Sequence, residues 1–567
     1  MQFYIKYQKR NVLLAKAMDK RPFIMSGLAR FIRLAILVWL SAAFPFPGPA
    51  RAQDGGHYGD RIIIGSIGEA TNLVPHLSSD TASSEISQHL FLALLKLDKD
   101  LNLVPWAAES FEVLDEGLTL RFTLRPGILW QDGVEMTADD VEFTYKTMID
   151  PKTPTAYGGG YRMVSSFTVL DRYTVEVRYD KPYARSLLTW ASGILPKHLM
   201  EGTDLTKTPY AHNPVGSGPF RFKEWVRGSR IALEANPDFY FGRPNLDGVV
   251  YTVIPDLTTM FLELKAHSID MMSLTPQQYT FQASSPAIRD EYNSFRYLAY
   301  SYAYFGYNLD RPMFRDVRVR RAFSHAIDKN EIITGSLLGQ GVPTIGPYTP
   351  GSWVYNEAIT PYSYDLDAAR ELLAEAGWKA DEKGILRGAD GEPFRFTILT
   401  NQGNEQRIKT AVIIQSQLAK LGVQAEVRTV EWAVFLSRFL NVGRYDAVVM
   451  GWTVPVDPDL YDVWHSANIP TEDAPQGLNM MRYANPELDG IIVTARSTFD
   501  REERKRLYDR AQEILHEEQP YCFLYVPYTL PVVQKRFQGV EEAPAGITWN
   551  FDNWWVPPTE QRHTQGP

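Results

Sequence analysis

The chain offers few residues whose types and spacing could support catalysis. Ten histidines occur in 567 residues, but none forms a His-Glu-x-x-His motif or an i, i+4 pair that could bind zinc. The single cysteine, Cys522, excludes a cysteine-based zinc site. It lies in the apolar run Tyr521-Cys522-Phe523-Leu524-Tyr525, which favours a buried and unreactive thiol. We therefore predict no metal site and no cofactor.

Three other motifs match catalytic or phosphate-binding patterns only in part. The triplet Gly216-Ser217-Gly218 lacks the spacers of a Gly-x-Ser-x-Gly nucleophile turn. The run Gly158-Gly159-Gly160 is more typical of a flexible turn than of a phosphate site, and no P-loop occurs. The neighbours Asp139 and Asp140 would point apart on a helix, which makes them a poor acid–base couple. Nothing here gives a positive reason to propose an enzyme, and we expect none.

Length and charge narrow the class of protein. A chain of 567 residues exceeds what one hydrophobic core usually serves, so we expect two or more lobes. Aromatic residues make up 13%, which fits either large cores or a ligand cleft. Beyond residue 52 the chain has 49 basic and 66 acidic residues. A body with that acidic excess repels phosphate backbones, so nucleic-acid binding is not expected.

The first 52 residues have the pattern of an export signal. Arg30 and Arg33 precede the apolar run 34–44, and Ala50-Arg51-Ala52 follows a Pro/Gly stretch, which predicts cleavage before Gln53. The run is shorter than the roughly 20 apolar residues that span a bilayer. An uncleaved signal-anchor is the alternative. We expect an exported, periplasmic protein.

Two details qualify the signal. Residues 1–24 are long for the basic region of a signal peptide, and a start at Met18 or Met25 would leave one of ordinary length. No cysteine lies near the predicted cleavage point, so a lipoprotein is not expected.

The first half of the mature chain reads as rich in strands. The run 61–67 suits a buried strand, and residues 118–125 alternate apolar and polar side chains as a half-buried strand does. Thr137 and Asp140 have the spacing of a capping box that begins a helix. A second alternating strand is predicted over 167–179, and residues 210–256 are rich in strands and turns.

The second half alternates helices and strands. Asp316 and Asp365 are expected to cap amphipathic helices, and a charged helix is expected near 501–518. Between them, strands alternate with helices over the following ranges: strand 394–400, helix 404–421, strand 423–430, a short helix from Glu431 and strand 445–452. This order indicates an α/β lobe with a largely parallel sheet.

Six sequence blocks, in order, resemble the extracellular solute-binding proteins of the dipeptide and oligopeptide type, known as family 5. Together they cover nearly the whole mature chain. The blocks are LTLRFTLRPGILWQDGVEMTADDVEFTYK (118–146), NPVGSGPF (213–220), NPDFYFGRPNLDGV (236–249), FRDVRVRRAFSHAIDKNEI (314–332), GWTVPVDPDLYDVWHS (451–466) and FDNWWVP (551–557). A single block would be weak, but six in the expected order make coincidence implausible.

The resemblance implies a two-lobed α/β periplasmic-binding-protein fold of type II, in the class with an extra subdomain and with a hinge between the lobes. The chain would cross between lobes near 300–308 and return near 520. The implied division is lobe I over 53–91, 205–300 and 521–567, the extra subdomain over 92–204, and lobe II over 301–520.

The resemblance also implies a function and its partners. A small solute would bind between the lobes, which would close on it and then dock on the permease subunits of an ATP-driven (ABC) importer in the inner membrane. An oligopeptide is the expected solute, and a monomer is the expected state. The alternatives are a non-peptide solute on the same fold (an oligosaccharide, an opine-like compound or chelated nickel), a sensor subunit, and an exported hydrolase.

Two tryptophans are candidate ligand contacts. The family places the Trp of its Gly-Trp element, here Trp452, at the border of the cleft, and Trp432 matches another cleft aromatic. An indole can pack on a ligand, although a core position is the alternative for each.

The charged clamps of dipeptide-binding members are missing. The aspartate that holds the ligand's amino group would fall at Val454 or Pro455, and the arginine that holds its carboxylate would fall at Asn401, with Arg407 the nearest arginine. Asp457 and Asp459 lie close by, where a turn is the alternative role. Without both clamps a tight dipeptide site is not expected, because a buried charged terminus needs a partner. The ligand-binding candidates are Trp452, Trp432, Asp457, Asp459, Asn401 and Pro455.

Overall fold

The computed structural model describes residues 58–563 apart from 78–79, 154, 156, 206 and 472–476. The predicted signal peptide, its cleavage before Gln53 and the alternative starts at Met18 and Met25 lie outside the described residues. The chain divides into the units Met1–Asp54 and Gly55–Pro567, and all the described residues belong to the second unit. In the described part of the chain, no helix combines the length and apolarity that crossing a membrane would require.

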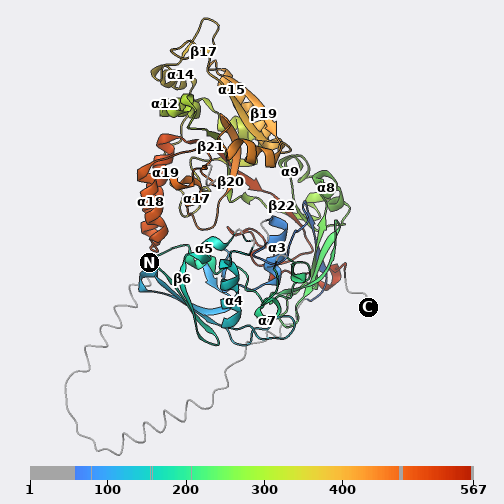
Figure 1. Ribbon diagram of the computed structural model, residues 1–567. Helices are drawn as coiled ribbons and strands as arrows, with labels where there is room; N and C mark the ends of the chain where they lie inside the picture. Colours follow the sequence, from blue (N-terminus) through green and yellow to red (C-terminus); the bar gives the residue numbers. More distant parts are fainter. Residues whose placement is uncertain are drawn as a thin grey trace, which may run out of the picture. The chain divides into compact units, whose positions relative to one another are not determined.

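A seven-stranded sheet, the first sheet, joins segments from both ends and the middle of the chain (Figure 1). Its order is β12-β22-β11-β1-β10-β9-β8, with parallel pairing only between β1 and its neighbours β10 and β11. The strands are β1 (Arg61–Ser66), β8 (Phe220–Val226), β9 (Arg230–Ala235), β10 (Gly248–Val253), β11 (Met271–Ser273), β12 (Tyr292–Ser294) and β22 (Pro531–Gln534). The predicted strand at 61–67 and the strand-rich region 210–256 are confirmed, although only Ile62 of β1 is fully buried.

Short helices accompany the first sheet and the segment that follows β1. They are α3 (Thr81–Leu90), α6 (Ser186–Thr189), α7 (Lys197–Met200), α8 (Leu257–Lys265), α9 (Pro276–Gln282) and α10 (Pro286–Arg289). The hairpin of β2 (Leu95–Leu97) and β3 (Leu103–Pro105) follows α3.

A separate antiparallel sheet has the order β4-β5-β7-β6. Its strands are β4 (Ala108–Leu114), β5 (Thr119–Leu124), β6 (Val164–Asp171) and β7 (Thr174–Tyr179). The alternation predicted for 118–125 is confirmed, because Leu120, Phe122 and Leu124 of β5 are buried. Between β5 and β6 lie α4 (Ala138–Ile149) and α5 (Gly158–Arg162). The predicted capping box begins α4, where the Thr137 N–H donates to Asp140 at 2.8 Å.

The single strand predicted over 167–179 is wrong, because the segment is a hairpin of β6 and β7. The Asp171 carboxylate accepts a 2.8 Å hydrogen bond from the N–H of Tyr173. This contact of a side chain with the backbone two residues on forms a turn at Arg172. The alternation continues through the turn, so the pattern alone did not reveal it.

A second seven-stranded sheet, the second sheet, contains most of the strands between 297 and 529. Its order is β13-β21-β14-β20-β18-β19, with β15 beside β21. The strands are β13 (Tyr297–Leu298), β14 (Ser301–Tyr307), β15 (Gly341–Pro343), β18 (Arg395–Asn401), β19 (Gln424–Val430), β20 (Ala447–Thr453) and β21 (Tyr521–Thr529). The expectation of a largely parallel sheet is wrong. Within this sheet β18 pairs in parallel with β20 and β19, but β14 pairs antiparallel with both β20 and β21, and β13 and β15 pair antiparallel with β21.

Both faces of the central strand β20 are buried. Along β20, Ala447 and Val449 pack into one core while Val448 and Met450 pack into another on the opposite face. An apolar run without alternation is the pattern that such a strand requires. Cys522 on β21 is fully buried, as predicted.

Helices gather around the second sheet (Figure 1). They are α11 (Pro312–Arg315), α12 (Val317–Ala326), α13 (Lys329–Leu337), α14 (Leu366–Glu375), α15 (Glu405–Ala419), α16 (Trp432–Val434) with a π-helical turn at Phe435–Leu440, α17 (Tyr461–Trp464), α18 (Pro486–Ser497) and α19 (Arg501–Glu518). A small hairpin comprises β16 (Lys379–Ala380) and β17 (Leu386–Arg387). The predicted caps Asp316 and Asp365 are confirmed, since each side chain accepts from backbone N–H groups of its helix.

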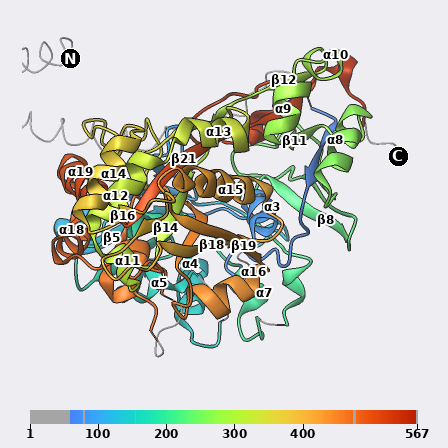
Figure 2. The ribbon, with the colours of Figure 1, turned by 90° about the horizontal axis from the view of Figure 1, so that it is seen from above.

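The described chain passes between the first and second sheets twice, and the two passages lie side by side. One runs from β12 to β13 through Phe295 and Arg296, and the other from β21 to β22 through Leu530. They form an antiparallel ribbon, in which the Phe295 N–H donates to the Pro531 carbonyl at 2.9 Å. Figure 2 shows β21 running toward β12 and α9. The predicted crossings between lobes near 300–308 and near 520 stay a prediction.

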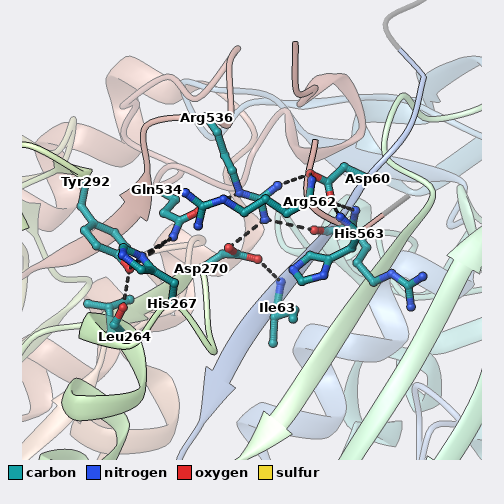
Figure 3. Close-up of polar contacts among 11 residues, drawn as sticks. Asp60, Ile63, Leu264, His267, Asp270, Tyr292, Gln534, Arg536, Arg562 and His563 are labelled. Atoms are coloured by element: carbon teal, nitrogen blue, oxygen red, sulfur yellow. Dashed lines mark hydrogen bonds and ion pairs between the residues drawn. The ribbon is translucent and has the colours of Figure 1, made fainter. Parts of the chain in front are cut away.

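A buried ion network lies just beyond Gln534, at the end of β22 opposite Leu530 (Figure 3). Arg536, which follows β22, forms ion pairs with two carboxylates. One is Asp60, just before β1, and the other is Asp270, just before β11, at 2.8 Å. The three side chains are at most 4% exposed. Backbone N–H groups complete the network by donating to both carboxylates, including that of Ile63 to Asp270 at 2.8 Å. The network thus ties together three segments that are distant in sequence.

Replacing Arg536 should therefore destabilise the fold strongly. Arg536→Met leaves two buried carboxylates without their cation, and we expect the free energy of unfolding to fall by about 3–5 kcal/mol. Chemical denaturation measures this change. The matched control is Arg289→Met, which breaks an exposed pair with Asp290 and should leave the free energy of unfolding nearly unchanged. Equal losses in the two variants would contradict a stabilising role for the network.

Candidate functional site

Two adjoining cavities open between segments of the first half of the chain and segments of the second-sheet half. The first has a volume of about 700 Å³ and the second about 580 Å³, both within the range of small-molecule sites. Leu97, Leu101 and Leu188 line both cavities. The cavities therefore form one continuous candidate site.

The first cavity is lined mainly by the first half of the chain and by the C-terminal segment. Six aromatic residues contribute to its wall: Trp106, Tyr157, Tyr161, Tyr183, Trp549 and Phe551. Among the described residues of the second-sheet half, Asp462 and Arg496 contribute to this wall. Asp552 and Lys96 add charge of opposite sign.

The second cavity has a larger share of its wall from the second-sheet half. Tyr300, the loop 348–354 without its residue 350, and residues 454–458 face the β2–β3 hairpin and residues 184–188. Pro455 and Asp457, both predicted ligand contacts, line this cavity, as does Val454. The other four candidates line neither cavity.

Asp457 is engaged by an arginine. The Arg504 guanidinium donates to both carboxylate oxygens of Asp457 at 2.9–3.1 Å, and the two side chains are 10% and 12% exposed. Such a two-bond contact fixes the position of both groups. The Asp457–Arg504 pair thus fastens the loop 454–458, which lines the second cavity, onto helix α19.

Asp459 lies in a contact between the two halves. Its carboxylate is 3% exposed, lies 3.0 Å from the Arg496 guanidinium and 4.0 Å from that of Arg185. Burial raises the pKa of Asp459, and Arg496 opposes this shift. The carboxylate also accepts from the Tyr461 N–H at 3.0 Å, which is the turn geometry considered for it. The backbone supports the same contact, since the Ala184 N–H donates to the Arg496 carbonyl at 2.7 Å.

The two candidate tryptophans differ in exposure. Trp452, on β20, is half-buried and donates from its indole nitrogen to the Tyr521 hydroxyl at 3.3 Å. Trp432, on α16, is 44% exposed, with the Phe435 ring 6.0 Å away. Their roles as ligand contacts stay predictions.

Asn401 ends β18 and accepts a 2.9 Å hydrogen bond from the Arg407 guanidinium. Arg407 therefore reaches back to the position where the resemblance implied a carboxylate-binding arginine. No carboxylate of the described residues forms an ion pair with it, and burial lowers its pKa. Arg407 lies six positions after Asn401 in the sequence, and the start of helix α15 brings its side chain back to Asn401.

Sequence reasoning missed much of the wall. Asp552 belongs to the block FDNWWVP, which was recognised without a ligand role. The loop 348–354 and the β2–β3 hairpin carry no pattern that distinguishes a cavity wall from an ordinary loop. Within the described ranges, no group of three or more His, Cys, Asp or Glu side chains could hold a metal ion.

Comparison with known proteins identifies the family. Residues 102–470 match the bacterial extracellular solute-binding proteins, family 5. The chain is 35% identical to the oligopeptide-binding protein AppA of Bacillus subtilis strain 168, over 95% of this chain and the whole relative. The chain belongs to this family, as the six sequence blocks predicted. It is also 28% identical to the dipeptide-binding protein of Escherichia coli K12, over 80% of this chain and 86% of that protein.

Solved structures confirm the two-lobed α/β fold. The structure of AppA from Bacillus subtilis in complex with a nonapeptide superposes with a TM-score of 0.74, at 35% identity, over 88% of this chain and 99% of that one. NikZ from Campylobacter jejuni in complex with Ni(L-His) gives a TM-score of 0.75 at 27% identity, with the same coverage. Family members of this fold thus hold peptides in one case and a metal chelate in another.

The Asp457–Arg504 pair should stabilise the wall of the second cavity. Arg504→Met leaves a nearly buried carboxylate unpaired, and we expect a loss of about 3–5 kcal/mol in the free energy of unfolding. Urea denaturation measures it. The control Arg510→Met, on the same helix, removes exposed pairs with Glu487 and Glu513 and should cost about 1 kcal/mol or less. If Arg504→Met is no worse than this control, the pair does not fasten the loop.

Proposed function

We propose that this protein is an exported, non-enzymatic binding protein that captures an oligopeptide and delivers it to the permease of an ABC importer. One observation carries the choice of solute. The chain matches, over nearly its whole length, an oligopeptide-binding protein whose solved structure holds a nonapeptide. The two adjoining cavities supply a site of suitable size, with aromatic, aliphatic and charged side chains in their walls.

The proposed site lies between the halves of the molecule, and closure would bring its walls together. The division into lobe I, extra subdomain and lobe II stays as predicted from the sequence. The ribbon at 295–296 and 530 is the proposed hinge, because these few residues join the two sheets. The contact of Asp459 with Arg496 would then belong to the closed form, since it joins residues near 184 to helix α18.

Backbone recognition suits this chain better than charge clamps at both ends of a dipeptide. Pro455 and Asp457 line the second cavity at the place of the missing amino-group clamp, and Asp457 is already paired with Arg504. Trp452, Trp432 and Asn401 are proposed as further contacts. A peptide longer than two residues leaves its termini free to reach other partners or solvent, which avoids the cost of burying an unpaired charge.

Native mass spectrometry of residues 53–567, purified gently from the periplasm of the source cells, tests the proposal. We expect a mixture of bound species whose mass differences match amino-acid residues, together with no turnover of those peptides on incubation. A single non-peptidic mass or a nickel adduct would leave the family intact and overturn the peptide assignment. Shortening of the bound peptides on incubation would instead favour a hydrolase.

A further inference from the structure

Asp552 is a charged residue on the wall of the first cavity that the proposed function does not yet use. It lies in the short 3-10 turn Phe551–Asn553, between two buried aromatic residues, Phe551 and Trp554. Those neighbours fix the turn in the core of the first half of the molecule. The backbone that carries the carboxylate is therefore held in place before any solute arrives.

The Asp552 carboxylate has neither a hydrogen bond nor an ion pair with any of the described residues, although the side chain is half-buried. Burial raises its pKa to about 6, and Lys96 opposes this shift from beyond ion-pair distance. Lys96 itself is exposed and lies over the Trp106 ring at 5.3 Å. A partly desolvated carboxylate without a partner is costly, which makes a cationic partner favourable.

The other charged groups of the first cavity are exposed or already occupied. Arg185 and Arg496 both lie within 4.0 Å of Asp459. Asp462 is exposed, and its negative charge interacts with the positive charge of Arg496. His89, which also lines this cavity, hydrogen-bonds the Tyr251 hydroxyl at 3.1 Å, and burial lowers its pKa to about 4. Asp552 is thus the one charged side chain of this wall that is both half-buried and uncommitted among the described residues.

Aromatic residues of the same wall also suit a cation. Ring faces attract ammonium and guanidinium groups, and Trp106 and Trp549 line the same cavity as Asp552. A free carboxylate of the solute would instead meet the like charge of Asp552.

We propose that Asp552 binds a cationic group of the solute, either the amino terminus of a peptide or the side chain of a lysine or arginine. This proposal depends on the proposed function only in taking the solute to be a peptide. The residue would take over the amino-group role that the sequence lacks at Val454 and Pro455, from the opposite wall of the cleft. It would make the protein select solutes that carry a positive charge.

Four synthetic nonapeptides of alanine, glycine and serine test this, with or without one central lysine and with a free or acetylated amino terminus. Binding is measured by calorimetry at pH 7.5. We expect the wild type to bind the acetylated, lysine-free peptide at least tenfold more weakly than the peptide that has both a free amino terminus and a lysine. The Asp552→Asn variant keeps the side-chain shape and should bind all four within about twofold. Comparing the free-amino, lysine-free peptide with the acetylated, lysine-containing one tells which cation is bound.

The control Asp462→Asn removes the other carboxylate of this wall and should keep the tenfold preference. Lowering the pH from about 7.5 to about 5 should weaken binding of the cationic peptides to the wild type. The reason is that a carboxylate with a pKa of about 6 becomes neutral over this range, so the attraction present above pH 6 is lost below it. Lys96, Arg185, Arg496, Asp462 and His89 face the same cavity, so the Asp552→Asn variant must show a flatter profile for the effect to belong to Asp552.

Equal binding of all four peptides by the wild type, or an unchanged preference in Asp552→Asn, overturns the proposal and leaves peptide binding intact. If none of the peptides binds, the proposed function fails on its own. In that case the role of Asp552 is tested on the solute that co-purifies with the wild type, which native mass spectrometry identifies. A solute with an amine or guanidinium that is lost from Asp552→Asn supports the role of Asp552, and a neutral or anionic solute overturns it.

Discussion

The two-stranded ribbon between the sheets is the constraint on which the rest of the molecule depends. Only the passages at 295–296 and at Leu530 join the first sheet to the second in the described chain, and they pair with each other. Hydrogen bonds within the ribbon resist separation of the two halves, while its few residues leave room for bending. The ion network of Arg536 lies at the other end of β22 and ties together the segments that lead into β1 and β11 of the first sheet.

This arrangement explains why the walls of the cleft come from distant parts of the sequence. The chain leaves the first sheet, builds the whole second sheet and returns, so the C-terminal segment with Asp552 lies back among residues of the first half. The loop 454–458, from the second-sheet half, lines the adjoining second cavity. A solute between these walls touches both halves, which couples its binding to the angle at the ribbon.

The sequence predicted the elements with local signals and missed those that depend on distant partners. The caps at Asp316 and Asp365 follow from side chains next to the helices they begin. The direction of β14 and β21 in the second sheet does not, because it is set by a crossing from another sheet. The same contrast between local signals and distant partners holds for the site. The place of Pro455 in a cavity wall could be inferred by aligning the chain with the family's sequence blocks. The uncommitted state of Asp552 is visible only when every neighbour in space is known.

Hydrogen–deuterium exchange with and without bound solute tests most directly whether one solute contacts both halves across the ribbon. We expect slower amide exchange on binding in the β2–β3 hairpin (95–105) and in the loop 454–458 together, with slower exchange at the ribbon residues 295–298 as the angle becomes fixed. Protection confined to one half of the molecule, with the other half and the ribbon unchanged, would contradict a shared site between the halves.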